Sequence, residues 1–183
     1  MKLIMIIKIR GETMRIGLFY GSTTGNTDQV AEEIRDGIGE DLIEVFEDVA
    51  DIDTEDLLGF DVLILGIPTW DIGELQSDWG VHYDELENYD FTDTRIAMFG
   101  CGDQDGYPDN FLDAVGMLYD ALIARGATGG IGFWPTEGYG FQFSRAQRGD
   151  KFCGLGIDED NETDLTPERI ENWCAQVKSE LGL

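Results

Sequence analysis

Two glycines and a run of hydroxyl side chains precede a predicted helix, in the stretch FYGSTTGNT from Phe19 to Thr27. Backbone N–H groups at a helix start lack intrahelical partners and carry partial positive charge, so such a stretch can hold a phosphate. The glycines allow close approach and the hydroxyls can donate hydrogen bonds. The motifs of nucleoside-triphosphate loops and dinucleotide folds are both absent. Taken alone, the stretch is equally compatible with a polar turn.

Two further stretches combine aromatic, acidic and glycine residues: PTWDIGELQSDW at 68–79 and GCGDQDGYPDN at 100–110. Trp70 directly follows an apolar run and stands outside any periodic apolar stripe, and Tyr107 lies in the other stretch. Aromatic side chains on neighbouring loops can hold a flat ring, and stacking contributes ~0.5–1.5 kcal/mol beyond the burial of area. The alternative for Trp70 is packing beneath its own loop.

Short apolar runs alternate with amphipathic stretches along the chain. Strands are predicted at 15–20, 42–46, 61–68, 95–101 and 128–134, and helices at 27–38, 110–125 and after Thr166, taken as the N-cap. Because parallel neighbours need crossover connections, this alternation predicts an α/β, three-layer doubly wound sandwich with a five-stranded parallel sheet. Such sheets bind ligands at the carboxyl ends of their strands. The stretches at 19–27, 68–79 and 100–110 are therefore expected to meet there.

The charge balance is extreme: 38 acidic residues oppose 12 basic ones among 183, and no Lys or Arg lies between Arg35 and Arg95. Such a surface repels nucleic acid and anionic membranes and attracts partners with a basic patch, although solubility in a salty cytoplasm would also explain it. Three cysteines without metal-ligand spacing are typical of a reducing compartment, which favours a cytoplasmic protein. No segment reaches transmembrane length.

Residues 1–13 precede the first strongly patterned strand. Their apolar segment LIMII is too short for a signal peptide and lacks a small-residue cleavage site. We interpret 1–13 as an N-terminal appendage or an overcalled start, and 14–183 as a single domain; an extra edge strand is the alternative.

The three loop stretches together resemble the FMN-binding loops of flavodoxins. The ending GLGIDEDNETDLTPERIENWCAQVKSELGL resembles the long-chain type found in cyanobacteria and other bacteria, and the similarity runs from about Met14 to Leu183. The resemblance implies strand order 2-1-3-4-5, with the last strand interrupted by a long loop, and non-covalently bound FMN. It further implies a low-potential one-electron carrier that shuttles between semiquinone and hydroquinone, without substrate turnover, catalytic residues or metal.

Roles carry over from the resemblance residue by residue. Residues 22–27 would cradle the phosphate, Trp70 and Tyr107 would stack on the two ring faces, and the backbone of 71–73 would lie at the flavin N5 and reorient on reduction. Asp103 would accept from the pyrimidine N–H. The predicted cofactor-binding residues are Ser22, Thr23, Thr24, Gly25, Asn26, Thr27, Pro68, Thr69, Trp70, Asp71, Ile72, Gly73, Cys101, Gly102, Asp103, Tyr107 and Asn110.

The absence of Lys and Arg from the phosphate stretch bears on the redox chemistry. Fully reduced FMN prefers to be anionic, which is unfavourable beside Asp71, Asp103 and Asp105. One acid ~8 Å away at an effective dielectric constant of ~20 costs about 2 kcal/mol, a downward shift of roughly 90 mV for a one-electron couple. Asn26 and Asp71 stand where some relatives have Lys and Asn, so both favour lower potentials, whereas Cys101 replaces a common hydroxyl.

The resemblance also implies partners: ferredoxin–NADP reductase or a similar flavoprotein reductase, and photosystem I, nitrogenase or pyruvate oxidoreductase. A monomer that docks through its acidic surface is expected, without nucleic acid or membrane insertion. The irregular segment 137–157 carries Arg145, Arg148 and Lys151. In the family it is associated with partner docking, and a tolerated surface excursion is the alternative.

The sequence favours an electron carrier over three other functions. An NAD(P)H-dependent quinone reductase of similar fold is the second choice, but it needs a more open ring face. A receiver domain needs an acidic cluster after the first strand, where this chain has Tyr20, Gly21 and Ser22. A flavin-free interaction surface would retain little or no flavin. The lone His82 is interpreted as a surface or half-buried residue without a catalytic role.

Overall fold

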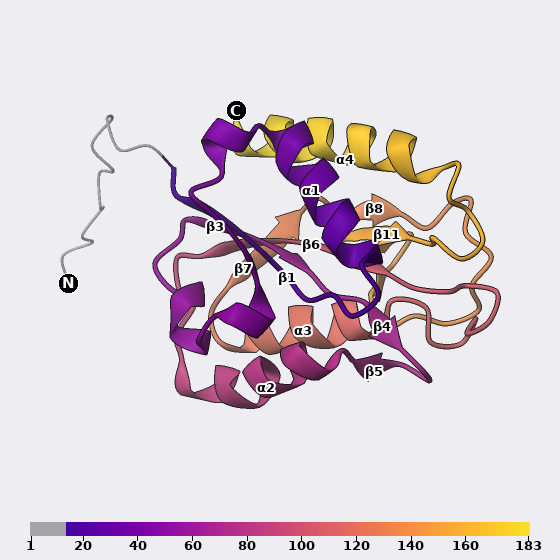
Figure 1. Ribbon diagram of the computed structural model, residues 1–183, viewed down its shortest axis with the longest axis horizontal. Helices are drawn as coiled ribbons and strands as arrows, with labels where there is room; N and C mark the ends of the chain where they lie inside the picture. Colours follow the sequence, from indigo (N-terminus) through magenta and orange to yellow (C-terminus); the bar gives the residue numbers. More distant parts are fainter. Residues whose placement is uncertain (1–13) are drawn as a thin grey trace.

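The computed structural model describes residues 14–183, so the predicted appendage at 1–13 lies outside the described residues (Figure 1). A parallel sheet forms the centre, in the order β11-β6-β3-β1-β2 with β7 also paired to β6. Its strands are β1 (Ile16–Tyr20), β2 (Val45–Asp48), β3 (Val62–Gly66), β6 (Arg95–Cys101), β7 (Thr128–Ile131) and β11 (Leu155–Ile157). The predicted α/β fold and strand order are confirmed.

Helices cover both faces of the sheet. One face carries α1 (Asn26–Ile38) and α4 (Thr166–Leu181), and the other carries α2 (Ser77–Glu85) and α3 (Asp113–Ala124) (Figure 1). Each face has its own apolar core cluster, and all residues of β1 and β3 are buried, as strands covered on both sides should be. Among residues 14–183, no helix combines the length and apolar character needed to cross a membrane.

The fifth position of the sheet is filled by two short strands. β7 pairs with the start of β6, with Thr128 opposite Arg95, and β11 pairs with its end, with Ile157 opposite Cys101. Between them the chain forms a small antiparallel sheet from β8 (Trp134–Pro135), β9 (Gln147–Arg148) and β10 (Lys151–Phe152). The interruption of the last strand is therefore confirmed, although the strand predicted at 128–134 already ends at Ile131.

Several predicted boundaries are wrong by a few residues. The strand predicted at 42–46 lies at Val45–Asp48, because Gly39 with φ 120° starts the 3₁₀ turn η1 (Glu40–Leu42). α3 begins at Asp113, not 110, because Leu112 adopts φ 58° and interrupts the helical path. Leu165 is the residue before α4, so Thr166 is its first helical residue rather than its N-cap.

His82 is buried, contrary to the predicted surface or half-buried position; the residue is 5% exposed. The 3₁₀ turn η2 (Val49–Asp51) packs against its helix α2, and Thr54 of the 3₁₀ turn η3 (Thr54–Leu57) contacts it. Its Nδ1 lies 2.7 Å from Thr54 Oγ1 and its Nε2 lies 2.7 Å from the Val49 carbonyl oxygen. Both ring nitrogens therefore have structural partners. The last short turn, η4 (Leu86–Asn88), follows α2 directly.

Candidate cofactor site

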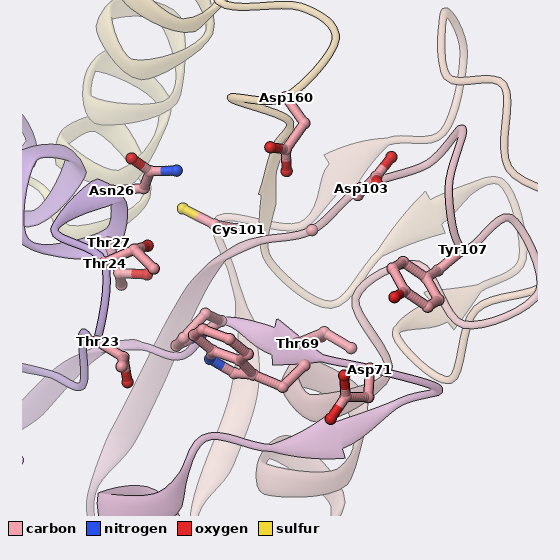
Figure 2. A pocket seen from close by; sticks show the side chains of 13 residues that line it. Thr23, Thr24, Asn26, Thr27, Thr69, Asp71, Cys101, Asp103, Tyr107 and Asp160 are labelled. Carbon is pink, nitrogen blue, oxygen red and sulfur yellow. The ribbon is translucent and has the colours of Figure 1, made fainter.

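A cavity of about 410 Å³ lies at the carboxyl ends of β1, β3 and β6, and its size is that of a small-molecule site. Figure 2 shows Thr23, Thr24, Asn26 and Thr27 on one side, Asp71, Asp103 and Tyr107 on the other, and Cys101 between them. The structure thus brings the three predicted stretches together. The lining residues are Thr23, Thr24, Asn26, Thr27, Pro68, Thr69, Trp70, Asp71, Cys101, Gly102, Asp103, Tyr107 and Asp160.

Five predicted residues do not line the cavity. Ser22 and Gly25 shape the first loop, because Ser22 Oγ accepts the Gly25 N–H at 3.1 Å. Ile72 is 72% exposed at the rim, and Gly73 closes a turn by donating its N–H to the Trp70 carbonyl. The Asn110 amide donates to Asp113 Oδ2 at 3.0 Å, within the fold.

Asp160 lines the cavity and was missed by the sequence analysis. It follows β11, whose carboxyl end lies beside that of β6. The signal was present in the sequence, since an acidic run follows the last strand of the sheet. The interrupted strand obscured it, because the strand was predicted near 128–134 and the second half was not placed.

The phosphate side, residues 21–28, is the start of α1 and the loop before it. Gly25 precedes the helix with φ 93° and provides no side-chain cap, so the first helical N–H groups stay available to a ligand. Asp28 lies in the first turn, and no Lys or Arg from the described residues lines the cavity. The partial charge of the helix start and the hydroxyls of Thr23 and Thr24 are therefore the donors available to an anion.

Cys101, the last residue of β6, lines the cavity. Burial, with help from nearby acids, raises the pKa of the Cys101 thiol to about 12. The thiol is therefore protonated at neutral pH and is a poor nucleophile.

The ring side, 68–73 and 101–110, begins with a two-strand hairpin. β4 (Thr69–Trp70) pairs with β5 (Glu74–Leu75), and the turn between them holds Asp71 at φ 44° and Gly73 at φ 93°. A positive φ is uncommon for a residue other than glycine and is a feature of functional turns. Within residues 14–183, Trp70 Nε1 is the one buried side-chain nitrogen or oxygen without a hydrogen-bond partner. Buried polar atoms are nearly always hydrogen-bonded, and an acceptor on a bound ligand would complete this one.

The third loop is held by the carboxylate of Asp103. Its Oδ1 accepts the N–H groups of Asp105 and Gly106, at 3.1 and 2.7 Å, and the side-chain amide of Asn161 at 2.8 Å. These bonds, that of Gly106 first, lower the pKa of Asp103. Because Oδ1 is fully engaged, only Oδ2 is available for the predicted bond to a ring N–H. Tyr107 follows in this loop and is 41% exposed.

The electrostatic character of the cavity is acidic. Asp71, Asp103 and Asp160 line it, and partial burial together with Asp103 and Asp158 raises the pKa of Asp160. In the described part of the chain, no group of three or more His, Cys, Asp or Glu residues is arranged to hold a metal ion. The site can bind an anion with a flat ring, and its lining offers no activated nucleophile.

Comparison with known proteins identifies relatives over nearly the whole chain. The family model described as flavodoxin matches residues 18–173. A flavodoxin of Nostoc sp. is 52% identical, over 92% of this chain and 98% of that protein. The flavodoxin of Haemophilus influenzae is 48% identical, over 92% of this chain and 96% of that protein. The crystal structure of Fusobacterium nucleatum flavodoxin bound to flavin mononucleotide superposes with a TM-score of 0.83 and 32% identity, covering 91% of this chain and 98% of that one.

Proposed function

The chain belongs to the flavodoxin family, and we propose that it is a low-potential one-electron carrier that works through FMN bound in the cavity between its three loops. As a flavodoxin it is an electron carrier and not an enzyme. The observation that carries the proposal is the cavity itself: a helix start and hydroxyls at one side, aromatic side chains at the other, and carboxylates without a cation.

The described residues fit FMN at both ends. The α1 start with Thr23 and Thr24 would hold the phosphate, and Trp70 and Tyr107 would enclose the ring. The unpartnered Trp70 Nε1 supports a ligand acceptor close to the indole. When bound, FMN supplies the redox chemistry, because it accepts and releases electrons one at a time. The protein supplies the binding groups, the surrounding charge and the exclusion of water.

The carboxylates would determine how strongly reducing the carrier is. Asp71, Asp103 and Asp160 place negative charge around the ring and oppose a second negative charge there. The carrier would therefore cycle between its one-electron-reduced and fully reduced forms at low potential. The turn at 71–73, with its two positive φ angles, would supply a backbone carbonyl oxygen that accepts a hydrogen bond from a ring N–H of the reduced cofactor.

Docking would use the acidic surface around the cavity, through weak and salt-sensitive encounters with basic flavoprotein reductases and low-potential acceptors. The basic residues of 137–157 support this role less well. Arg148 pairs with Asp120 at 2.5 Å, and Arg145 lies 3.9 Å from Asp113, so both guanidinium groups have acidic neighbours on α3. These two arginines would therefore attract an acidic partner only weakly.

Stepwise anaerobic reduction of the purified protein, followed by visible spectroscopy, tests the proposal. The purified protein should first show the absorption bands of about one flavin per chain. These should be replaced by the long-wavelength absorption of a one-electron-reduced form and then by a bleached spectrum. Bleaching in a single two-electron step would favour the quinone reductase. A colourless protein that takes up no added FMN would refute the assignment.

A further inference from the structure

Gln76 is a fully buried amide whose position calls for an explanation. It is 1% exposed and directly precedes α2, where its Oε1 accepts the Trp79 N–H at 3.1 Å and caps the helix. Residues that commonly cap helices in this way are Ser, Thr, Asp and Asn. Glutamine is one methylene longer than asparagine, so the cap alone does not account for its length.

The nitrogen end of the same amide explains that length. Gln76 Nε2 donates to Asp78 Oδ2 at 2.6 Å and to Thr23 Oγ1 at 3.3 Å. The orientation of the amide is fixed, because exchanging its oxygen and nitrogen would place the oxygen against the Asp78 carboxylate and the nitrogen against the Trp79 N–H. All polar atoms of the side chain are then used, and one of its bonds reaches the phosphate side.

The contact with Gln76 determines what the Thr23 hydroxyl can do. An amide NH₂ group has no lone pair to offer, so Thr23 Oγ1 must act as acceptor in this bond. Thr23 lines the cavity, and no other hydrogen bond engages its hydroxyl within residues 14–183. Its single O–H hydrogen is therefore left to point into the cavity, where an anion lacking any Lys or Arg partner needs donors.

Close packing around Gly21 keeps these groups in place. A Cβ on Gly21 would lie 2.6 Å from Gln76 Oε1 and 2.6 Å from Trp79 Cδ1, so the loop rests directly on the cap of α2. The carbonyl of Gly66, at the end of β3, accepts both the Gly21 N–H at 3.0 Å and Trp79 Nε1 at 2.8 Å. The phosphate side, β3 and the start of α2 form one unit.

We propose that Gln76 is a positioning residue for the phosphate seat, which acts by turning the hydroxyl of Thr23 into a donor toward the anion. It does not touch the ligand. The inference rests on the proposed function in one respect, since the anion is taken to be the phosphate of FMN. It extends that function by linking the second loop of the site to phosphate recognition in the first.

The test compares dissociation constants of FMN and of riboflavin, which lacks the phosphate, for the apoprotein of wild type and variants. Gln76→Asn retains an amide that can cap α2 but shortens its reach, and Thr23→Val removes the hydroxyl. Each should weaken FMN binding roughly 10- to 100-fold, as expected for a lost hydrogen bond to a charged group, and riboflavin binding less than about twofold. The double variant should match Thr23→Val alone, because Gln76 acts through Thr23.

Gln29→Asn is the matched control, because Gln29 is an exposed residue of α1 whose amide, among residues 14–183, donates to Glu33 on the same helix. It should change neither constant. Equal losses for FMN and riboflavin in Gln76→Asn would overturn the inference and leave only a structural cap, and so would additive losses in the double variant. Both outcomes leave the proposed function intact. A wild type that binds no FMN would overturn both together.

Discussion

The two sides of the cavity are built in different ways. The phosphate side, residues 21–28, is one continuous stretch made of a glycine-containing loop and a helix start, and Gln76 contacts it from the second loop. The ring side combines residues 68–73 and 101–110, which meet only through the fold. The lining residues at one end of a site can thus be neighbours in the chain while those at the other end come from separate stretches, and the two ends should respond differently to mutation.

The ring side is braced by segments that follow it in the chain. Gly140 donates its N–H to Gln104 Oε1 at 2.5 Å, and the Gln142 and Phe143 N–H groups donate to the Pro108 carbonyl at 2.7 and 3.0 Å. The Arg145 N–H donates to Asp113 Oδ1 at 2.7 Å. Segment 137–157 therefore supports the Tyr107 loop through hydrogen bonds to residues on either side of Tyr107.

Asp158 is the most deeply buried of these braces and should give the largest effect. It is fully buried, and its carboxylate accepts N–H groups of Gln104, Asp160 and Asn161 at 3.1–3.2 Å. Asp158→Ala leaves these donors without their acceptor, at about 1–3 kcal/mol for each one that stays buried. We expect a loss of roughly 3 kcal/mol in the free energy of unfolding of the apoprotein, measured with urea.

Asp164→Ala removes the same charge from an exposed position nearby and serves as the control. It should stay within about 0.5 kcal/mol of wild type. If the two variants were equally stable, the ring side would not depend on the Asp158 brace.

Trp70→Leu, on the ring side, should weaken the binding of FMN and of riboflavin alike, unlike a variant on the phosphate side. Losing the indole removes stacking and apolar contact, worth about 2 kcal/mol together. The affinities for FMN and for riboflavin should therefore both fall about 30-fold in fluorescence titrations. Thr24→Val, on the phosphate side, should weaken FMN binding alone. A loss confined to FMN in Trp70→Leu would place the ring away from the indole.

This difference between the sides also explains what the sequence could and could not predict. The phosphate side was readable because its glycine and hydroxyls are neighbours in the chain, and the apolar runs identified β1, β3 and β6. The long-range hydrogen bonds that support the loops could not be predicted. Asp158 bonds Gln104 across 54 residues, and Gln76 bonds Thr23 across 53, without any local pattern that pairs them.

The buried position of His82 shows the same limit. Its helix α2 was not among the helices whose bounds were predicted, and the partners of the imidazole come from η2 and η3. Those 3₁₀ turns were not predicted, because short turns held by capping bonds leave a weak signal. Tertiary contacts, which periodicity does not encode, decided the burial of this residue.

Asn26→Lys tests how a positive charge on the phosphate side changes the affinity for FMN. Asn26 is the first residue of α1 and lines the cavity. An exposed ammonium ~6 Å from the phosphate, screened by water to an effective dielectric constant of ~60, contributes about 1 kcal/mol. FMN binding should tighten about fivefold at low salt and return toward wild type at high salt, and riboflavin binding should not change. Gln29→Lys adds the same charge one turn later and should have a smaller effect; equal effects would indicate a general charge response.

Asp160→Asn should give the smallest effect. The sign of its effect on the free energy of unfolding distinguishes Asp160 from Asp103. The pKa of Asp160 is raised from the ordinary 3.8, so the folded state holds this proton to higher pH than the unfolded chain does. Stability is therefore lost as pH rises from 3.8 through the raised pKa, and the ionised group destabilises the fold above it. Asp103, with its lowered pKa, behaves oppositely: it stabilises the fold above the ordinary value, and that contribution is lost as pH falls through the folded pKa.

Unfolding of Asp160→Asn at pH 3 and at pH 7 measures this directly. The variant should match wild type at pH 3 and be slightly more stable at pH 7, where Asp103→Asn should be less stable. FMN affinity at pH 7 should rise about twofold, as expected for removing one solvent-screened charge ~8 Å from the ligand. An Asp160→Asn protein less stable than wild type at pH 7 would mean that this carboxylate braces the ring side, as Asp158 does, instead of only charging it.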